Sequence, residues 1–499
     1  MAAPVRPPGV YQIAEDDWEV VPFALGPTWD KDPDWDGPRD PEGFILPRLT
    51  LGWQAITWIE ANLLSDDLDE NDNPLPIKLT NEQMRWLLWF YAIDEAGRFI
   101  WREFVLQRLK GWGKDPLAAV VAAVEFVGPC RFAGWATVDL PGLGLEAGDP
   151  VAKPHPRAWI QVAAVSLVQT QNTMALFRGL FSRACISEHG IDMGKTVIYA
   201  YGGQKQIQAV TSSPRSLEGN RPTLVIKNET HHWLVNNDGV AMADAIERNA
   251  AKAKDGAART LSITNAYEPS EDSVAQSERE SWEAGESGEQ IRTDTMYDSL
   301  EAPKEAKLRP KMPEDLEPEE QERRTRIYLR RVLEAVRGDA IWLDIQSLTN
   351  SILNPKNKPS RSRRFWFNQI RANEDAWVDA LAVAAAVDVM AAENRQRRER
   401  DSRSILEAGW DLVHPTEPVV MTFDGSKSDD ATGLIGTRLS DGYQFVIGVW
   451  QPPPKVRNKD NTWLAPREAV DARVGEAFKR FNVVAFWGDP SHAKDDEDG

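Results

Sequence analysis

The segment that most constrains this fold is 99–126, where an apolar stretch, a glycine-containing turn and an alanine- and valine-rich stretch follow one another. Residues 99–106 (FIWREFVL) favour a β-strand. The turn is 110–115 (KGWGKD), and residues 116–126 (PLAAVVAAVEF) are long enough for about three turns of buried helix. A strand, a glycine turn and a helix in this order make a phosphate-binding loop, because backbone N–H groups and the positive end of the helix face an anion.

The loop departs from the pattern G-x-x-x-x-G-K-[ST] at two positions, with Arg108 at the first glycine and Asp115 at the hydroxyl. Lys114 retains the lysine that holds the β- and γ-phosphates of a nucleotide, and Arg108 and Lys110 add positive charge. A carboxylate at position 115 can bind Mg²⁺, although it repels phosphate oxygens. Asp115 and Pro116 also have a purely structural interpretation, as N-cap and first residue of a helix. The two interpretations are compatible.

A second lysine matches the end of the pattern more literally, in Gly194-Lys195-Thr196. Its context differs, because 197–201 is β-prone and supplies no helix N-terminus. His189 also stands where the first glycine is needed. We therefore interpret this segment as a turn before a strand.

Size, charge and cysteine content narrow the class of protein. A chain of 499 residues is too long for one core, so we expect two or three domains. No apolar run approaches the roughly 20 residues that span a bilayer, and the N-terminus lacks the basic and apolar regions of a signal peptide. Cys130 and Cys185 alone suit a reducing compartment. With a net charge of −19, contacts to nucleic acid must come from local basic patches.

Strands alternate with helices through the first half of the chain, which predicts an α/β fold with a parallel sheet flanked by helices. Residues 1–48 are rich in Pro, Asp and Gly and indicate an extended arm. Residues 266–410 are charged and predicted to be mostly helical, and a new sheet begins at Pro418. In parallel sheets ligands lie at the carboxyl ends of strands. There the prediction places 108–115, Asn228-Glu229 and Thr264-Asn265.

Glu229 follows an apolar strand and is the candidate general base that activates the attacking water. Asn228 before it is a neutral and weaker Mg²⁺ ligand than an aspartate, and it balances the extra charge of Asp115. A single acid after a strand also occurs in ordinary solvated loops. His231-His232 suggest a metal site, but no cysteine or acid spacing supports one, and a structural role is the simpler interpretation.

Taken in order, these motifs resemble the large terminase subunit of tailed bacteriophages, an ATPase and nuclease that packages DNA. The resemblance covers roughly Leu49 to the C-terminus. It rests on the segment LTNEQ, the loop RLKGWGKD and SLEGNRPTLVIKNETHHW, followed by ITNAYEP, MYDSLEAP, RRFWFNQIRANEDAWV, MTFDGSKSDDATG and FWGDPSHAKDDED. Each motif is weak alone, and their order gives the set its specificity.

The resemblance implies a phosphate-loop ATPase that uses ATP and Mg²⁺, with an adenine-side contact near Gln83. It implies catalysis by Glu229 with Lys114 and a motif at Thr264-Asn265 that couples hydrolysis to motion. The implied nucleotide-binding residues are Gln83, Arg108, Lys110, Gly111, Trp112, Gly113, Lys114 and Asp115.

The resemblance also implies a ribonuclease H-like nuclease domain from about Pro418. Asp424 and Asp489 each follow a predicted strand and are the candidate ligands for a pair of Mg²⁺ or Mn²⁺ ions. Turn residues are the alternative interpretation of two such aspartates. The third acid of the family lies further along than Gly499, so we expect an incomplete nuclease domain in this chain.

The predicted organisation is an N-terminal arm (1–48), an ATPase domain with a helical subdomain or linker (49–410) and the start of a nuclease domain (411–499). The implied function is ATP-driven movement of double-stranded DNA into a procapsid, followed by cutting of the genome. The implied partners are DNA, a portal protein and a small terminase subunit, with no membrane. The implied location is the host cytoplasm and, as an oligomeric ring, the portal. The alternatives are a helicase-like DNA translocase without nuclease activity and a packaging or assembly factor that does not hydrolyse ATP.

Overall fold

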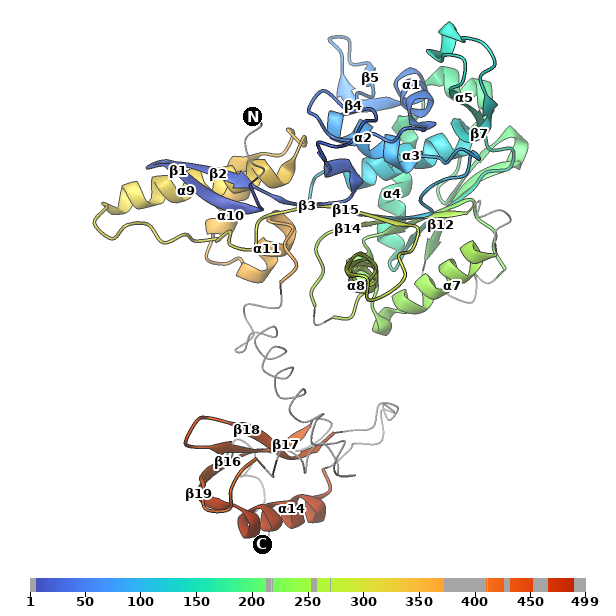
Figure 1. The fold of residues 1–499 in the computed structure, drawn as a ribbon. Coiled ribbons are helices and arrows are strands. Elements are labelled where there is room, and N and C mark those ends of the chain that lie inside the picture. The colour runs from blue at the N-terminus through green and yellow to red at the C-terminus, as the bar shows by residue number, and fades with distance from the viewer. Residues whose placement is uncertain are drawn as a thin grey trace. The chain divides into compact units, whose positions relative to one another are not determined.

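A computed structural model describes residues 6–211, 217, 219–252, 258–269, 271–371, 410, 412–425, 431–451 and 465–488. The chain divides into two compact units, Met1–Asp379 and Ala380–Gly499 (Figure 1). Among the helices in these ranges, none is long and apolar enough to cross a membrane.

The first unit is built on a nine-stranded sheet with the order β10-β11-β12-β9-β13-β14-β6-β15-β3. Neighbouring strands from β12 to β15 run parallel, and the edge strands β11, β10 and β3 are antiparallel to their neighbours. The α/β fold with a parallel sheet is therefore confirmed. The strands are β3 (Phe23–Leu25), β6 (Glu103–Gln107), β9 (Trp159–Ala164), β10 (Asp192–Met193), β11 (Val197–Ala200), β12 (Lys205–Thr211), β13 (Leu224–Asn228), β14 (Arg259–Thr264) and β15 (Thr295–Glu301).

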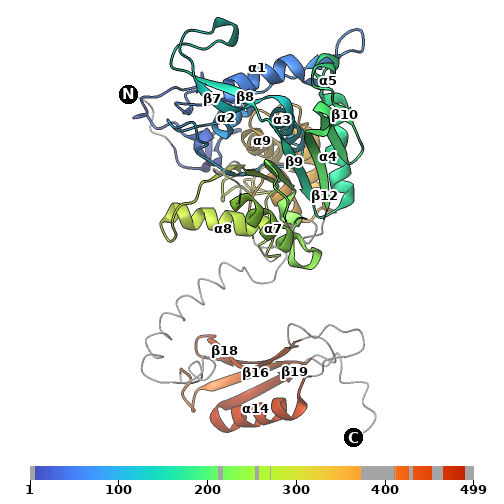
Figure 2. The same cartoon turned by 90° about the vertical axis from the view of Figure 1, so that its right-hand side faces the viewer.

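Helices cover both faces of this sheet, and the alternation of strand side chains divides the core accordingly. Leu224 and Ile226 of β13 pack in the larger hydrophobic cluster with α3 (Lys114–Val127). Val225, between them, packs in a second cluster with α7 (Gly239–Ala251) and the start of α8 (Val274–Ser287). Figures 1 and 2 show α7 and α8 on the opposite face of the sheet from α3.

The N-terminal arm packs on the first unit in several places, among them helix α2 (Asn81–Phe90), where Arg85 pairs with Asp40 at 2.6 Å. Its third strand, β3, pairs with β15 and forms an edge of the main sheet. The hairpin of β1 (Gly9–Ala14) and β2 (Asp17–Val21) lies against α9 (Pro318–Arg337), where Asp17 pairs with Arg331. The arm therefore links the edge of the sheet to the helices that follow it in sequence.

The other described elements of the first unit are short helices and hairpins around the sheet. They are α1 (Gly52–Asn62), β4 (Leu64–Leu68), β5 (Pro74–Pro76), α2 (Asn81–Phe90), β7 (Pro129–Trp135), β8 (Pro150–Pro154), α4 (Leu167–Leu180), α5 (Arg183–His189), α10 (Ile345–Leu353) and α11 (Pro359–Trp366).

Two local predictions are wrong. Residues 266–410 are not simply helical, because β15 lies in the sheet beside β6. The charged character of the region concealed this strand, whose buried Asp298 and Glu301 are neutralised by Arg108 and Arg279. Asp115 is also not the N-cap of α3. The helix begins one residue earlier, at Lys114, and Gly113 is its N-cap.

The second unit contains a four-stranded sheet with the order β18-β17-β16-β19. The first three strands pair antiparallel, whereas β16 and β19 are parallel. Helix α14 covers the sheet, and its Ala477 lies in a hydrophobic cluster with Trp410, Met421 and Phe445 (Figure 2). The elements are β16 (Pro418–Asp424), β17 (Thr432–Arg438), β18 (Gln444–Trp450), α14 (Arg467–Arg480) and β19 (Asn482–Gly488).

Candidate nucleotide-binding site

The glycine turn joins β6 to α3, as predicted, at the carboxyl end of the parallel strands. Gly111 and Gly113 adopt φ angles of 86° and 96°, in the left-handed region that a side chain disfavours. The second of these glycines lies directly before the first turn of α3, whose N–H groups have no partners within the helix. The loop therefore presents backbone donors and a helix N-terminus at one point.

The side chain of Lys114 is buried and folds back over the turn. Its Nζ donates hydrogen bonds to the carbonyls of Arg108 (3.1 Å) and Leu109 (3.2 Å). Burial lowers the pKa of Lys114 to about 8, and the carboxylates of Glu229 and Asp115 oppose this shift. A bound polyphosphate would favour the charged amine in the same way, by placing negative charge beside it.

The guanidinium of Arg108 does not face the turn. It is fully buried and forms ion pairs with Glu82 (2.9 Å) and Asp298. The backbone carbonyl of Arg108 accepts a hydrogen bond from Asn265 Nδ2 at 2.7 Å as well as the bond from Lys114. The buried Arg108 thus holds the start of the loop in place. Its positive charge is already paired with Glu82 and Asp298.

The remaining loop residues differ in what they expose. Lys110 is exposed, and its backbone N–H donates to the carbonyl of Phe365. The indole of Trp112 is buried under the loop, so this residue can offer a ligand only its backbone. From a distant segment, the half-exposed Trp342 donates its indole N–H to the carbonyl of Gly111 at 3.0 Å. Trp342 is thus a loop neighbour that the motif does not reveal.

Asp115 and Asn228, the two departures from the phosphate-loop pattern, are in contact. Asn228 Nδ2 donates to Asp115 Oδ1 at 3.0 Å and to Thr173 Oγ1 of α4 at 2.7 Å. The other amide atom, Asn228 Oδ1, is buried and has no hydrogen-bond partner. A carboxylate, an orphaned amide oxygen and a hydroxyl are the hard oxygen donors that Mg²⁺ prefers, so the chemistry of these residues suits the ion that the resemblance implies. The Asn228 atom that faces Asp115 and Thr173 here is the amide nitrogen.

Glu229 follows β13 in a strained conformation, with a φ of 57° that a non-glycine residue rarely adopts. Burial raises the pKa of its carboxyl group, and Lys114 opposes this shift. Glu229 follows β13, and the glycine turn follows β6. Strand β14, which ends at Thr264, lies between these two strands in the sheet. The three segments predicted to share this edge of the sheet are therefore brought together.

Gln83 has a structural role in the structure. Its side chain accepts a hydrogen bond from the backbone N–H of Thr80, and Thr80 Oγ1 accepts one from the backbone of Gln83, which forms the predicted capping box of α2. The preceding residue, Glu82, is the ion-pair partner of Arg108. Helix α2 is thereby connected to the start of the phosphate loop.

Of the two candidate nuclease ligands, Asp424 ends β16 and is exposed. Asp489 lies outside the described residues, so the structure does not relate the two carboxylates. The lysine of the alternative motif, Lys195, is exposed and precedes β11 rather than a helix, as predicted.

Comparison with known proteins places the chain among phage proteins. It is 37% identical over 493 residues to the Gene 13 protein of Mycobacterium phage D29, covering 94% of this chain and 77% of the relative. It is equally similar, at 37% over 490 residues, to the Gene 13 protein of Mycobacterium phage L5, with the same coverage of both chains. The chain belongs to this phage protein family. No family model matches the sequence.

Among solved structures, the large terminase of bacteriophage HK97 matches with a TM-score of 0.45 and 14% identity over 88% of this chain and 80% of that one. The ATPase domain of the Thermus phage P74-26 large terminase matches 38% of this chain and 70% of that domain, with a TM-score of 0.23 and 11% identity.

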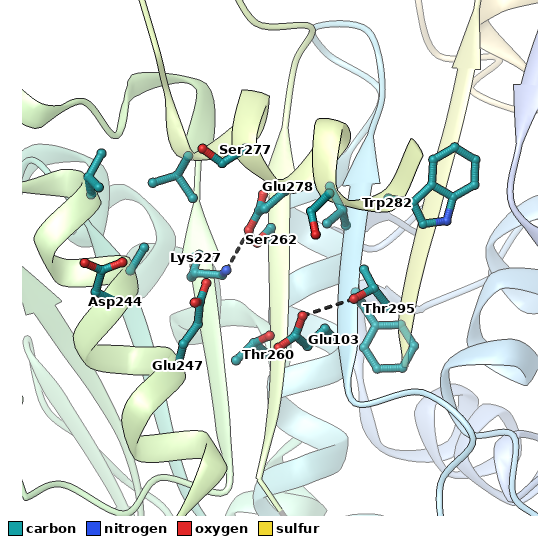
Figure 3. A pocket seen from close by; sticks show the side chains of 16 residues that line it. Glu103, Lys227, Asp244, Glu247, Thr260, Ser262, Ser277, Glu278, Trp282 and Thr295 are labelled. Carbon is teal, nitrogen blue, oxygen red and sulfur yellow. Dashed lines mark hydrogen bonds and ion pairs between the residues drawn. The ribbon is translucent and has the colours of Figure 1, made fainter. Parts of the chain in front are cut away.

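This member of the phage family has a further pocket of about 260 Å³ between the sheet, α7 and α8 (Figure 3). Lys227 faces Glu278 there, with 2.6 Å between the charged atoms, and Ser262 donates to the same carboxylate. The second oxygen of Glu278 accepts a hydrogen bond from Thr230, the residue after Glu229. Glu278 therefore connects the pocket to Thr230, in the segment that holds the candidate base.

Several residues of the site were not predicted from the sequence. They are Thr173, Glu82, Asp298, Glu278 and Trp342. Each reaches the site from an element distant in sequence. Glu82 and Asp298 lie in the motifs LTNEQ and MYDSLEAP, but the motifs did not indicate their contacts with Arg108. The only local signal is the position of Glu82 inside the capping box.

Proposed function

We propose that this chain is the ATPase subunit of a phage DNA-packaging motor, in which ATP hydrolysis drives double-stranded DNA into a procapsid. One observation carries the proposal. Lys114, the Asp115–Asn228 pair and Glu229 converge at one edge of a parallel sheet, each at the end of a strand or the start of a helix. An anion site, hard oxygen donors and a base are the parts that phosphoryl transfer to water requires.

In this mechanism the N–H groups of the glycine turn and Lys114 bind the phosphates of ATP. Lys114 exchanges its loop carbonyls for phosphate oxygens, and Asn265 continues to hold the carbonyl of Arg108. Asp115 and Asn228 would hold Mg²⁺, which neutralises phosphate charge when bound. Glu229 accepts the proton of the attacking water, and its buried position keeps its pKa above the ordinary value.

Replacing Lys114 by alanine tests the proposal, because it removes the cation that faces the phosphates. Steady-state phosphate release is measured with and without double-stranded DNA, and we expect Lys114→Ala to lower it at least about 10²-fold. The matched control is Lys195→Ala, which removes the exposed lysine of the alternative motif and is expected to have no effect. Equal phosphate release by the parent and Lys114→Ala would rule out the motor. A parent that releases no phosphate would favour the packaging or assembly factor that does not hydrolyse ATP.

We also propose that the second unit is the start of a ribonuclease H-like nuclease with Asp424 as a metal ligand. Its support is the sheet of the second unit, in which β16, β17 and β18 pair antiparallel and β19 pairs parallel with β16. This pairing places the end of β16 beside the end of β19. Asp424 ends β16 there, exposed and accessible to DNA.

The nuclease proposal predicts that the chain nicks supercoiled plasmid in the presence of Mn²⁺. Asp424→Ala is expected to abolish nicking, since Asp424 would hold a metal ion. A parent that does not nick would confine this chain to ATPase work. Asp441→Ala, which removes an exposed aspartate of the β17–β18 turn, is the control and is expected to nick as the parent does. An Asp424→Ala variant that nicks at the parent's rate would exclude this site.

We expect the partners of the motor to be a portal protein, a small terminase subunit and DNA, with assembly as a ring at the portal in the host cytoplasm. A helicase-like translocase remains the alternative, and the response to procapsids distinguishes it from a packaging subunit. A packaging subunit is stimulated further by procapsids that carry the portal, whereas a helicase-like enzyme responds to DNA alone.

A further inference from the structure

His231 is a fully buried side chain between the end of β13 and the end of β14. Its Nδ1 lies 3.1 Å from Thr264 Oγ1 and accepts a hydrogen bond from the backbone N–H of Asn265 at 3.4 Å. Its backbone N–H donates to Thr264 Oγ1 at 3.2 Å. On the other side of the ring, Nε2 lies 3.3 Å from Glu229 Oε2. One imidazole thus touches both the candidate base and the Thr264-Asn265 segment.

Two neighbours of Nδ1 favour opposite tautomers of this ring. The backbone N–H of Asn265 at 3.4 Å can only donate and favours an unprotonated Nδ1. Thr264 Oγ1 at 3.1 Å directs its own proton to the carbonyl of Asn265, so it favours a proton on Nδ1. Burial, together with the neighbouring groups His232, Arg364 and Lys114, lowers the pKa of His231 well below its usual value, which keeps the ring neutral. The neutral ring therefore directs its N–H at the carboxylate of Glu229 in one tautomer and at Thr264 Oγ1 in the other.

We propose that His231 is a positioning residue that links the orientation of the Glu229 carboxylate to the Thr264-Asn265 segment; this inference rests on the proposed ATPase function. The contact from Nε2 to Glu229 is longer than the 2.7–2.9 Å of a strong bond to a carboxylate, and Nε2 has no well-aligned partner. A small rotation of the strained Glu229 therefore makes or breaks this bond.

The same connection continues to the phosphate loop. Asn265 uses its backbone N–H for His231 and its side-chain amide for the carbonyl of Arg108, at 2.7 Å. That carbonyl also accepts the hydrogen bond from Lys114. When Lys114 leaves that carbonyl for phosphate, Asn265 Nδ2 remains its donor. A movement of the loop is therefore passed through Asn265 and His231 to the carboxylate that acts on water. His231 joins the two halves of this path.

The test compares His231→Phe, which keeps the ring and removes both nitrogens, with His231→Gln, which restores an N–H donor and an acceptor. His231→Phe is expected to lower kcat about 10²-fold, the effect of a misplaced catalytic group, and to abolish stimulation by DNA. The Kd of a non-hydrolysable ATP analogue is expected to change by less than about twofold, because His231 does not touch the loop. His231→Gln is expected to recover part of kcat, which a purely structural role would not produce.

Two controls separate this inference from the proposed function. His232→Phe changes the stacked neighbour, whose ring lies 4.0 Å from that of His231, and is expected to keep the parent's kcat. If the parent hydrolyses ATP and Glu229→Gln does not, the ATPase proposal stands. A His231→Phe variant with the parent's kcat and DNA stimulation would then overturn the positioning role alone.

A double-variant comparison tests the path itself. If His231 acts through Thr264, then Thr264→Val combined with His231→Phe should lower kcat no further than the worse single variant. Multiplicative losses would mean that the two side chains act independently, against the proposal.

The ligand atoms of Glu229, His231 and His232 also lie within 4.8 Å of one another, the spacing of a metal site. Loss of activity in 1,10-phenanthroline with recovery in Zn²⁺ would assign the cluster to a metal instead, whereas unchanged activity supports the positioning role.

Discussion

Replacing Glu229 by glutamine is expected to reduce the turnover of ATP by about 10²–10⁴-fold while leaving the affinity for ATP within about twofold. The amide has nearly the shape of the carboxylate but cannot accept the proton of the attacking water. Glu229 is held in place by its backbone, whose N–H donates to the carbonyl of Ile263, so the substitution leaves the position of the side chain intact. Its effect is therefore on kcat and not on binding.

The measurement is a single-turnover assay with a fluorescent ATP analogue, which gives binding and hydrolysis from the same sample. Glu60→Gln, on the exposed face of α1, is the matched control and is expected to behave as the parent. Parental turnover by Glu229→Gln would mean that another group activates water, and the mechanism proposed above would be wrong. Loss of binding together with turnover would instead assign Glu229 to holding the nucleotide.

The edge of the sheet that forms this site was predictable from the sequence because its signals are local. A strand, a glycine turn and a helix N-terminus identify Lys114 within a few residues. Glu229 and Thr264 each follow a short apolar strand, and parallel strands bring their carboxyl ends to one edge whatever lies between them in sequence. The rejection of Lys195 was equally local, since a strand follows it.

What surrounds that edge was not predictable, because it depends on pairings between distant segments. Strand β15 carries Asp298 and Glu301, and a sequence pattern shows only that these acids are charged. Their burial becomes possible when Arg108 and Arg279 arrive from other elements. For the same reason Arg108 was assigned to the phosphates, whereas in the structure its guanidinium is paired before any ligand binds.

That buried pairing leads to the second large effect. Arg108→Met is expected to lower the free energy of unfolding of the first unit by about 3–5 kcal/mol, because it leaves Glu82 and Asp298 buried without their cation. Both carboxylates have other donors that hold them in place. Glu82 accepts a hydrogen bond from the backbone of Asp339 at 3.0 Å, and Asp298 accepts one from Thr28. They cannot move to solvent without breaking these bonds, so the uncompensated charge remains inside.

The measurement is thermal unfolding of the full chain, followed by the tryptophan signal, with a loss of roughly 5–10 °C expected for Arg108→Met. Arg102→Met is the matched control, since Arg102 pairs with Asp294 at a half-exposed site and such pairs contribute about 0–1 kcal/mol. Equal melting of the two variants would show that the buried pairs add nothing beyond a surface pair. If Arg108→Met unfolds early and also binds ATP more weakly at 10 °C, where it is folded, the pairing sets the geometry of the loop as well as its stability. Weaker ATP binding without a change in melting temperature would instead indicate that Arg108 contacts the phosphates, as the sequence predicted.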